Sequence, residues 1–125
     1  MTPAEFMRRY AQASAAHDLD ATMRLIDEDA VYFFSNETCH IGRIAVEAAI
    51  KSNFDTIEME KFEMRDVECI LETEEAAVCL YNFHWSGRID GLARAGSGRG
   101  TSVLRRDGAS WRVVHEHLSH GEFRS

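Results

Sequence analysis

The spacing of apolar residues changes along the chain, and this change limits the folds that it can adopt. Before Lys61, apolar side chains recur at helical spacing in three places, and after it they alternate as in β-strands. The segment 2–5 has a threonine cap, a proline at the first helical position and a glutamate three residues after the cap. This pattern predicts the start of the first helix. We expect a second helix after Asp18 and a third over residues 46–54.

Short runs of β-branched and aromatic residues predict five strands, at residues 31–34, 61–71, 76–86, 101–106 and 111–119. The apolar alternation changes parity near Arg65 and Asp66, so we expect a bulge there. Asp107 and Gly108 are a favoured pair for the turn between the last two strands. The predicted order is α-α-β-α-β-β-β-β, which is an α+β fold.

Length and charge limit the classes of function. The chain has 125 residues, of which 45% are hydrophobic, and this is enough for one core in a single domain spanning residues 1–125. The 21 acidic residues outnumber the 14 lysines and arginines, which gives a net charge of −7. A phosphate backbone and an anionic membrane surface would both repel such a chain. We therefore expect neither nucleic acid nor a membrane as a partner.

The cysteines and the N-terminal residues bear on location. Cys39, Cys69 and Cys79 are odd in number and lack metal-binding or redox spacing. The first ten residues contain no apolar stretch before a cleavage site, and no segment has the ~20 apolar residues of a spanning helix. We expect a cytoplasmic protein.

Glycine is concentrated between the third and fourth predicted strands. This connection contains five of the eight glycines: Gly87, Gly91, Gly96, Gly98 and Gly100. A phosphate-binding loop would need a helix behind it, whereas here a strand is predicted to follow. The composition favours a mobile hairpin connection.

The C-terminal residues carry a family resemblance. Arg105-Arg106-Asp107-Gly108, then Trp111, then the run 114–119 (Val-His-Glu-His-Leu-Ser), resemble the closing hairpin of SnoaL-like domains and of the association domain of calcium/calmodulin-dependent kinase II. The resemblance extends over the whole element order and, loosely, to residues 76–85. It implies an NTF2-like (cystatin-like) cone: three helices packed on a curved antiparallel sheet, with a pocket at the wide end and dimerisation through the outer sheet face.

The resemblance also suggests which side chains face the pocket. The kinase hub has arginines at the positions of Asn82, Ser102 and Leu118, and their absence here argues against similar anion binding. By this alignment the even-numbered residues of the later strands point inward. We expect a largely apolar pocket lined by Leu80, Asn82, His84, Ser102, Leu104, Val114, Glu116 and Leu118, with Tyr32 and Phe34 from the first strand.

Glu116 is the best candidate for chemistry. A carboxylate in an apolar cavity has a raised pKa and can act as a general acid or base near neutral pH. His84 and Tyr32 are its candidate catalytic partners. The alternative is that Glu116 pairs with an arginine such as Arg99 or Arg105 and has no catalytic role.

The odd-numbered residues of the same strands are then predicted to face outward. His115 and His117 share a face, but no third ligand at suitable spacing completes a metal site, so we expect none. An exposed aromatic patch implies a buried partner surface. We expect a homodimer whose interface includes Tyr81, Phe83, Trp85, Trp111, His115 and His117.

Three functions remain open. The first is a dimeric module that binds a small apolar molecule. The second is a cofactor-independent isomerase, cyclase or dehydratase acting on a small apolar carbonyl compound, with Glu116 as acid or base. The third is a non-catalytic assembly module. The SnoaL-like scaffold hosts all three classes, so the fold alone does not choose among them, and none of them requires a cofactor.

Overall fold

The computed structural model describes residues 1–123 and has three helices and six strands. The helices are α1 (Pro3–Ala15), α2 (Leu19–Met23) and α3 (Arg43–Thr56). The strands are β1 (Ile26–Phe33), β2 (Cys39–Ile41), β3 (Glu58–Glu72), β4 (Ala76–Ile89), β5 (Leu92–Asp107) and β6 (Ser110–Ser119). The α+β NTF2-like fold is confirmed. The order is α-α-β-β-α-β-β-β-β, because the three-residue β2 was not predicted.

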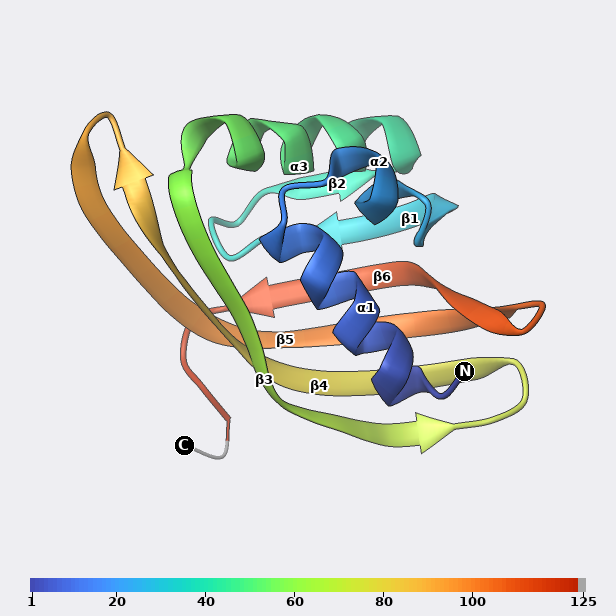
Figure 1. Ribbon diagram of the computed structural model, residues 1–125. Helices are drawn as coiled ribbons and strands as arrows, with labels where there is room; N and C mark the ends of the chain where they lie inside the picture. The colour runs from blue at the N-terminus through green and yellow to red at the C-terminus, as the bar shows by residue number, and fades with distance from the viewer. Residues whose placement is uncertain (124–125) are drawn as a thin grey trace.

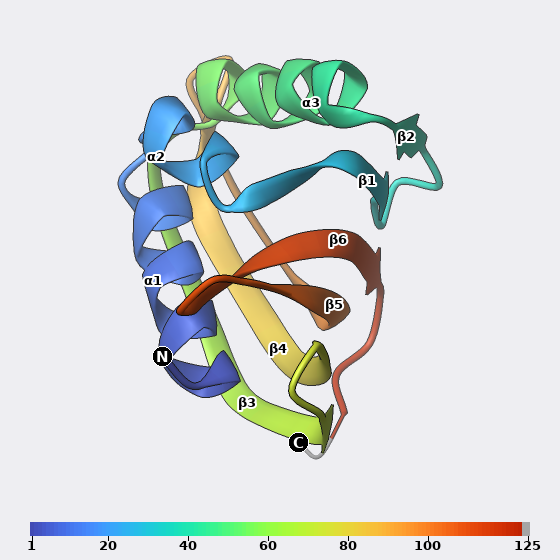
Figure 2. The same ribbon diagram turned by 90° about the vertical axis from the view of Figure 1, so that its right-hand side faces the viewer.

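The strands form one curved sheet in the order β2-β1-β6-β5-β4-β3. All neighbouring strands are antiparallel except β1 and β6, which are parallel, so the sheet is mixed rather than wholly antiparallel. Helix α1 crosses one face of the sheet, here called the inner face, and α3 lies above β1 (Figures 1 and 2). The hairpin between β4 and β5 curls toward the C-terminal end of α3 (Figure 1).

The local signals for helix α1 are confirmed. The Thr2 hydroxyl accepts from the Glu5 amide at 3.1 Å, and the Glu5 carboxylate accepts from the Thr2 amide at 3.4 Å. The helix ends in a Schellman arrangement, in which the Asp18 amide donates to Ala13 O and the His17 amide donates to Ser14 O. His17 therefore takes a left-handed conformation with φ of 54°. The expected bulge of β3 is also present, with Asp66 at φ 58°.

A second bulge, in β6, changes which residues face the helices. His115 pairs with Val103 while Val113 pairs with Leu104, so Val114 is an extra residue in β6. The strand therefore directs both Val113 and Glu116 inward, although their numbers differ in parity. The prediction that Trp111 and Val113 point outward is wrong, since both are buried in the core.

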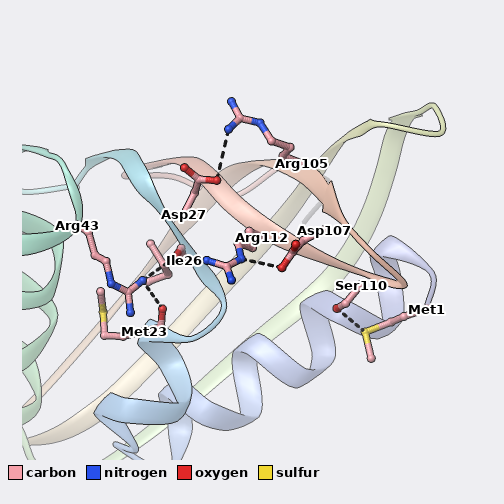
Figure 3. Close-up of polar contacts among 9 residues, drawn as sticks. All are labelled: Met1, Met23, Ile26, Asp27, Arg43, Arg105, Asp107, Ser110 and Arg112. Atoms are coloured by element: carbon pink, nitrogen blue, oxygen red, sulfur yellow. Dashed lines mark hydrogen bonds and ion pairs between the residues drawn. The ribbon is translucent and has the colours of Figure 1, made fainter.

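The side chain of Arg43 connects α3 to the start of the sheet. The Arg43 guanidinium donates to the carbonyls of Met23 and Ile26, each at 2.6 Å, which holds the first turn of α3 against the α2–β1 connection (Figure 3).

Within residues 1–123, no helix has the length and hydropathy needed to cross a membrane.

Candidate functional site

A cavity of about 350 Å³ lies between α1, α3 and the inner face of the sheet. This volume is within the range of small-molecule sites. Most of its wall is aromatic or aliphatic, including Phe34, Phe54, Phe62, Phe83, Trp85 and Leu118. Two acidic residues, Glu60 and Glu116, also line it, and the described wall contains no lysine, arginine or histidine. The cavity therefore suits a largely apolar ligand.

Glu116 lies at the inner end of the cavity within a hydrogen-bonded cluster. Its side chain is held by β6 among buried phenols, and the residue is only 6% exposed. The Tyr81 hydroxyl donates to Glu116 Oε1 at 3.0 Å, and the Ser102 hydroxyl lies 3.5 Å from the same oxygen. The hydroxyls of Tyr10 and Tyr32 are 2.7 Å apart. Because the cluster links α1, β1, β4, β5 and β6, its geometry is fixed by tertiary packing.

Burial sets the protonation of this cluster. Desolvation raises the pKa of the Glu116 carboxyl from its ordinary 4.5 to about 7, although hydrogen bonds from Tyr81, Tyr10 and Ser102 act in the opposite direction. Burial and the nearby Glu116 charge hold the pKa values of Tyr10, Tyr32 and Tyr81 well above their ordinary range. The phenols thus remain hydrogen-bond donors while the carboxyl gains and loses its proton near neutral pH.

Glycines on β5 allow the aromatic residues of β4 to line the cavity. Tyr81 pairs with Gly100, Phe83 with Gly98 and Trp85 with Gly96. A Cβ atom at Gly98 would lie 2.7 Å from the Phe83 ring, and one at Gly100 would lie 2.4 Å from the Tyr81 ring. The rings therefore occupy the space that β5 side chains would fill. The predicted hairpin connection is present, but its turn is confined to Asp90 and Gly91, and Gly96, Gly98 and Gly100 belong to the regular strand β5.

The structure confirms the inward orientation of part of the predicted pocket. Glu116, Leu118 and Phe34 line the cavity. Ser102 and Tyr32 are fully buried and belong to the Glu116 cluster, although neither reaches the cavity wall. Leu104 also points inward but packs in the core. Val114 lies at the β6 bulge and does not line the cavity.

The orientation predicted for β4 is wrong. Cys79, Tyr81 and Phe83 face inward, so Leu80, Asn82 and His84 lie on the outer face. Asn82 is buried there, and its side chain is fully hydrogen-bonded: its amide nitrogen donates to the Asp66 carboxylate and the Phe123 carbonyl, and its oxygen accepts from the Phe123 amide. The His84 imidazole pairs with Glu122 at 2.9 Å. His84 is thus separated from Glu116 by the sheet and does not partner it.

The same reversal changes the predicted interface. Tyr81, Phe83 and Trp85 line the cavity and form no outer aromatic patch. Trp111 is in the core, where its indole N–H donates to Met1 O at 3.0 Å. His115 and His117 do lie outside the cavity, and both pack against Phe33, with ring centres 5.0 and 5.3 Å from that of the phenyl ring.

The arginine alternative for Glu116 is also wrong. Arg105 pairs with Asp27 at 3.4 Å (Figure 3), and the Arg99 guanidinium donates to Ser119 at 3.2 Å. Glu116 instead receives its hydrogen bonds from neutral hydroxyls. In the described part of the chain, no three histidine, cysteine, aspartate or glutamate side chains lie close enough to hold a metal ion.

Sequence reasoning missed three residues of the site. The sequence analysis gives Tyr10 and Glu60 no place in the site and predicts Tyr81 on the outside of the sheet. Glu60 lines the cavity, and its Oε1 atom lies 2.6 Å from His17 Nε2. The alternating glycines of β5 were the available signal for Tyr81, because large rings pack over a strand that lacks side chains. We find no comparable signal for Glu60.

Solved structures with the same fold cover nearly the whole chain. A candidate calcium/calmodulin-dependent protein kinase type II association domain from Thiobacillus denitrificans is 22% identical, with a TM-score of 0.81 and coverage of 97% of this chain and 96% of that one. An NTF2-like superfamily protein from Salmonella enterica is 16% identical, with a TM-score of 0.83 and coverage of 97% and 89%. A ketosteroid isomerase-like protein from Erwinia carotovora is 15% identical, with a TM-score of 0.78 and coverage of 96% and 94%.

These structures share the fold at low sequence identity, so they do not select a function. Comparison with curated protein sequences gives no significant match. The sequence pattern of the SnoaL-like domain matches residues 4–121, which include every helix and strand described above except Pro3, the first residue of α1. The chain therefore belongs to the SnoaL-like domain family.

Proposed function

We propose that this domain binds a small, largely apolar molecule in the cavity and contacts its carbonyl or hydroxyl group through Glu116. The cavity has the size of a small-molecule site, and its wall is mainly aromatic and aliphatic. Its inner end carries the Glu116 carboxyl, beside the hydroxyl of Tyr81. A ligand with one polar group on an apolar body matches this distribution.

The observation that carries the proposal is the burial of Glu116 against the cavity without a cationic partner. A buried carboxyl that lacks a counter-charge favours its neutral form, and the neutral form can donate a hydrogen bond. With the Glu116 pKa at about 7, both forms are available near neutral pH. The neutral carboxyl would donate to a ligand carbonyl, and the carboxylate would accept from a ligand hydroxyl.

Binding can be tested with 2-acetylnaphthalene, an aromatic ketone that is small enough for the cavity. Titration into ¹⁵N-labelled protein is expected to shift the Trp85 indole signal and the amide signals around Glu116. Leu118→Trp fills the cavity and is expected to abolish these shifts. Leu92→Trp, at an exposed position of the β4–β5 hairpin, should leave them unchanged. Shifts confined to the outer face, or insensitive to Leu118→Trp, would overturn the proposal.

A second candidate function is proton transfer next to a carbonyl, as in a cofactor-independent isomerase, cyclase or dehydratase. The specific observation in its favour is a buried carboxyl beside the cavity with a pKa of about 7, the range in which a general acid or base is effective near neutral pH. The Glu116 carboxylate would accept a proton from the carbon adjacent to the carbonyl, leaving an enolate, and would return a proton to that carbon or to another atom of the product. In this mechanism Tyr81, rather than His84, is the hydrogen-bonding partner of the Glu116 carboxyl.

Deuterium exchange distinguishes binding from proton transfer. In D₂O, an active domain is expected to exchange the methyl protons of 2-acetylnaphthalene faster than buffer does, with a rate that rises as the carboxylate forms around pH 7. Glu116→Gln should return the rate to background, whereas Glu63→Gln, an exposed change, should not. Binding of the ketone without exchange of its methyl protons would support the binding function alone and exclude proton transfer from this ketone.

We also propose that the domain forms a homodimer through the outer face around Phe33, His115 and His117. These three side chains pack together, and Phe33 is 36% exposed. A surface of this kind provides an apolar centre with polar neighbours, as in many protein interfaces. It replaces the β4 aromatic residues as the expected contact.

A further inference from the structure

The cavity has a second carboxyl, at the end away from Glu116. Glu60 lines the wall from β3, and its side chain is 10% exposed. A Cβ atom at Gly87 would lie 3.3 Å from Glu60 Cα, which places Glu60 beside that part of β4. Tyr81, which contacts Glu116, lies further back along β4. Phe83 and Trp85 lie between these two points of the strand, so an aromatic section of wall separates the two carboxyls.

Glu60 is held by a histidine from another element. The His17 Nε2 atom lies 2.6 Å from Glu60 Oε1, and the imidazole stacks on Phe54 with ring centres 4.3 Å apart. His17 takes the left-handed position after α1 that glycine normally occupies. The contact with His17 orients the Glu60 carboxylate through Oε1, and within residues 1–123 no hydrogen bond from a protein group to Oε2 is found.

The charge distribution of the wall limits what Glu60 can bind. The wall carries two carboxyl groups, of Glu60 and Glu116, and no described lysine, arginine or histidine lines it. The one basic side chain in contact with Glu60, His17, lies behind the wall and is engaged at Oε1. A ligand carboxylate or phosphate would therefore approach the Glu60 carboxylate with no cationic side chain on the wall to pair with, which is unfavourable in a partly desolvated site. A hydroxyl or protonated amine would instead donate to the carboxylate, and charge-assisted hydrogen bonds of this type are strong.

We propose that Glu60 is a specificity residue of the cavity, which selects an elongated aromatic ligand whose outer end carries a hydrogen-bond donor and no negative charge. This inference rests on the proposed function, because it names the class of ligand for the same cavity. Glu116 receives the inner polar group of the ligand and Glu60 the outer one. His17 acts as a positioning residue, since it orients Glu60 without lining the cavity.

Three matched probes test the inference: 2-(2-naphthyl)ethylamine, 2-(2-naphthyl)ethanol and 2-naphthylacetate, titrated by calorimetry at pH 7.5. The amine and the alcohol are expected to bind the wild-type protein at least about tenfold more tightly than the acetate, as one charge-assisted hydrogen bond implies. Glu60→Gln should remove most of this difference. Glu63→Gln, on the same strand but exposed, should retain it.

A second variant keeps the inference testable if Glu60→Gln does not fold. His17→Asn keeps a residue that tolerates left-handed backbone and removes the imidazole contact, so it should reduce the amine-to-acetate ratio by less than Glu60→Gln does. A merely structural role of Glu60 would weaken all three probes equally, and that result would overturn the inference. So would an unchanged ratio in Glu60→Gln. If no probe binds the wild type, the proposed binding function fails as well.

Discussion

Replacing the Glu116 carboxyl with an amide should change how stability depends on pH. In the folded protein, burial raises the Glu116 pKa from 4.5 to about 7. Below pH 4.5 the carboxyl is protonated in both states, so it contributes no difference. Between pH 4.5 and 7 the unfolded chain loses this proton while the folded protein retains it, so the free energy of unfolding falls as pH rises.

The size of this effect follows from the two pKa values. A difference of about 2.5 pH units at ~1.36 kcal/mol each gives about 3 kcal/mol, fully lost above pH 7. Glu116→Gln removes the titrating group but keeps an oxygen that accepts from Tyr81. The unfolding free energy of the variant minus that of the wild type should therefore increase by about 3 kcal/mol between pH 4.5 and pH 8.

Urea denaturation followed by tryptophan fluorescence at several pH values measures this difference. The other carboxyl groups are common to both proteins, so their contributions cancel in the subtraction. Glu63→Gln, which changes an exposed glutamate of β3, is the matched control. A difference for Glu116→Gln that does not vary with pH would refute the account of Glu116 as a desolvated carboxyl.

Three other changes test separate parts of the structure. Gly98→Ala should destabilise the protein by about 2 kcal/mol, because the new methyl group meets Phe83 and the carbonyl of Ser119. Ser97→Ala, on the exposed side of the same strand, should not, and urea denaturation measures both variants. Phe33→Glu should convert a dimer to a monomer by light scattering, whereas Leu92→Glu should leave the mass unchanged, and a persistent dimer would place the interface elsewhere. Tyr81→Phe removes a donor to the carboxylate, so the Glu116 pKa measured by NMR should move further upward; a fall would contradict the direction assigned to this hydrogen bond.

Most of the fold was predictable because its signals are local. The capping residues of α1, the bulge at Asp66 and the turn at Gly108 act within a few residues of their own positions. Strand β2 was missed because its three residues are too few to show alternation, and its pairing with β1 depends on tertiary contact. The strand positions of Gly96, Gly98 and Gly100 were not predicted, because glycine is common both in connections and where another group packs closely, and only the paired rings of β4 identify the second case.

The site was predicted only in part, because strand orientation reverses when the register changes by one residue. Glu116 and Leu118 were placed correctly, but the β6 bulge at Val114 reverses the parity for Trp111. Alignment of Asn82 with an inward arginine reversed all of β4. The contacts that define the site, from Tyr10, Tyr81 and Glu60, join distant segments, and of the three only Tyr81 has a signal in the sequence, the alternating glycines of β5.

The central claim is that Glu116 is a buried carboxyl that exchanges its proton near neutral pH at the inner end of the cavity. A ¹³C NMR titration of its side-chain carboxyl carbon, assigned by comparison with Glu116→Gln, measures this property directly. We predict a midpoint at about pH 7. A midpoint near 4.5, the ordinary value for glutamate, would contradict the claim and remove the basis for proton transfer at this site.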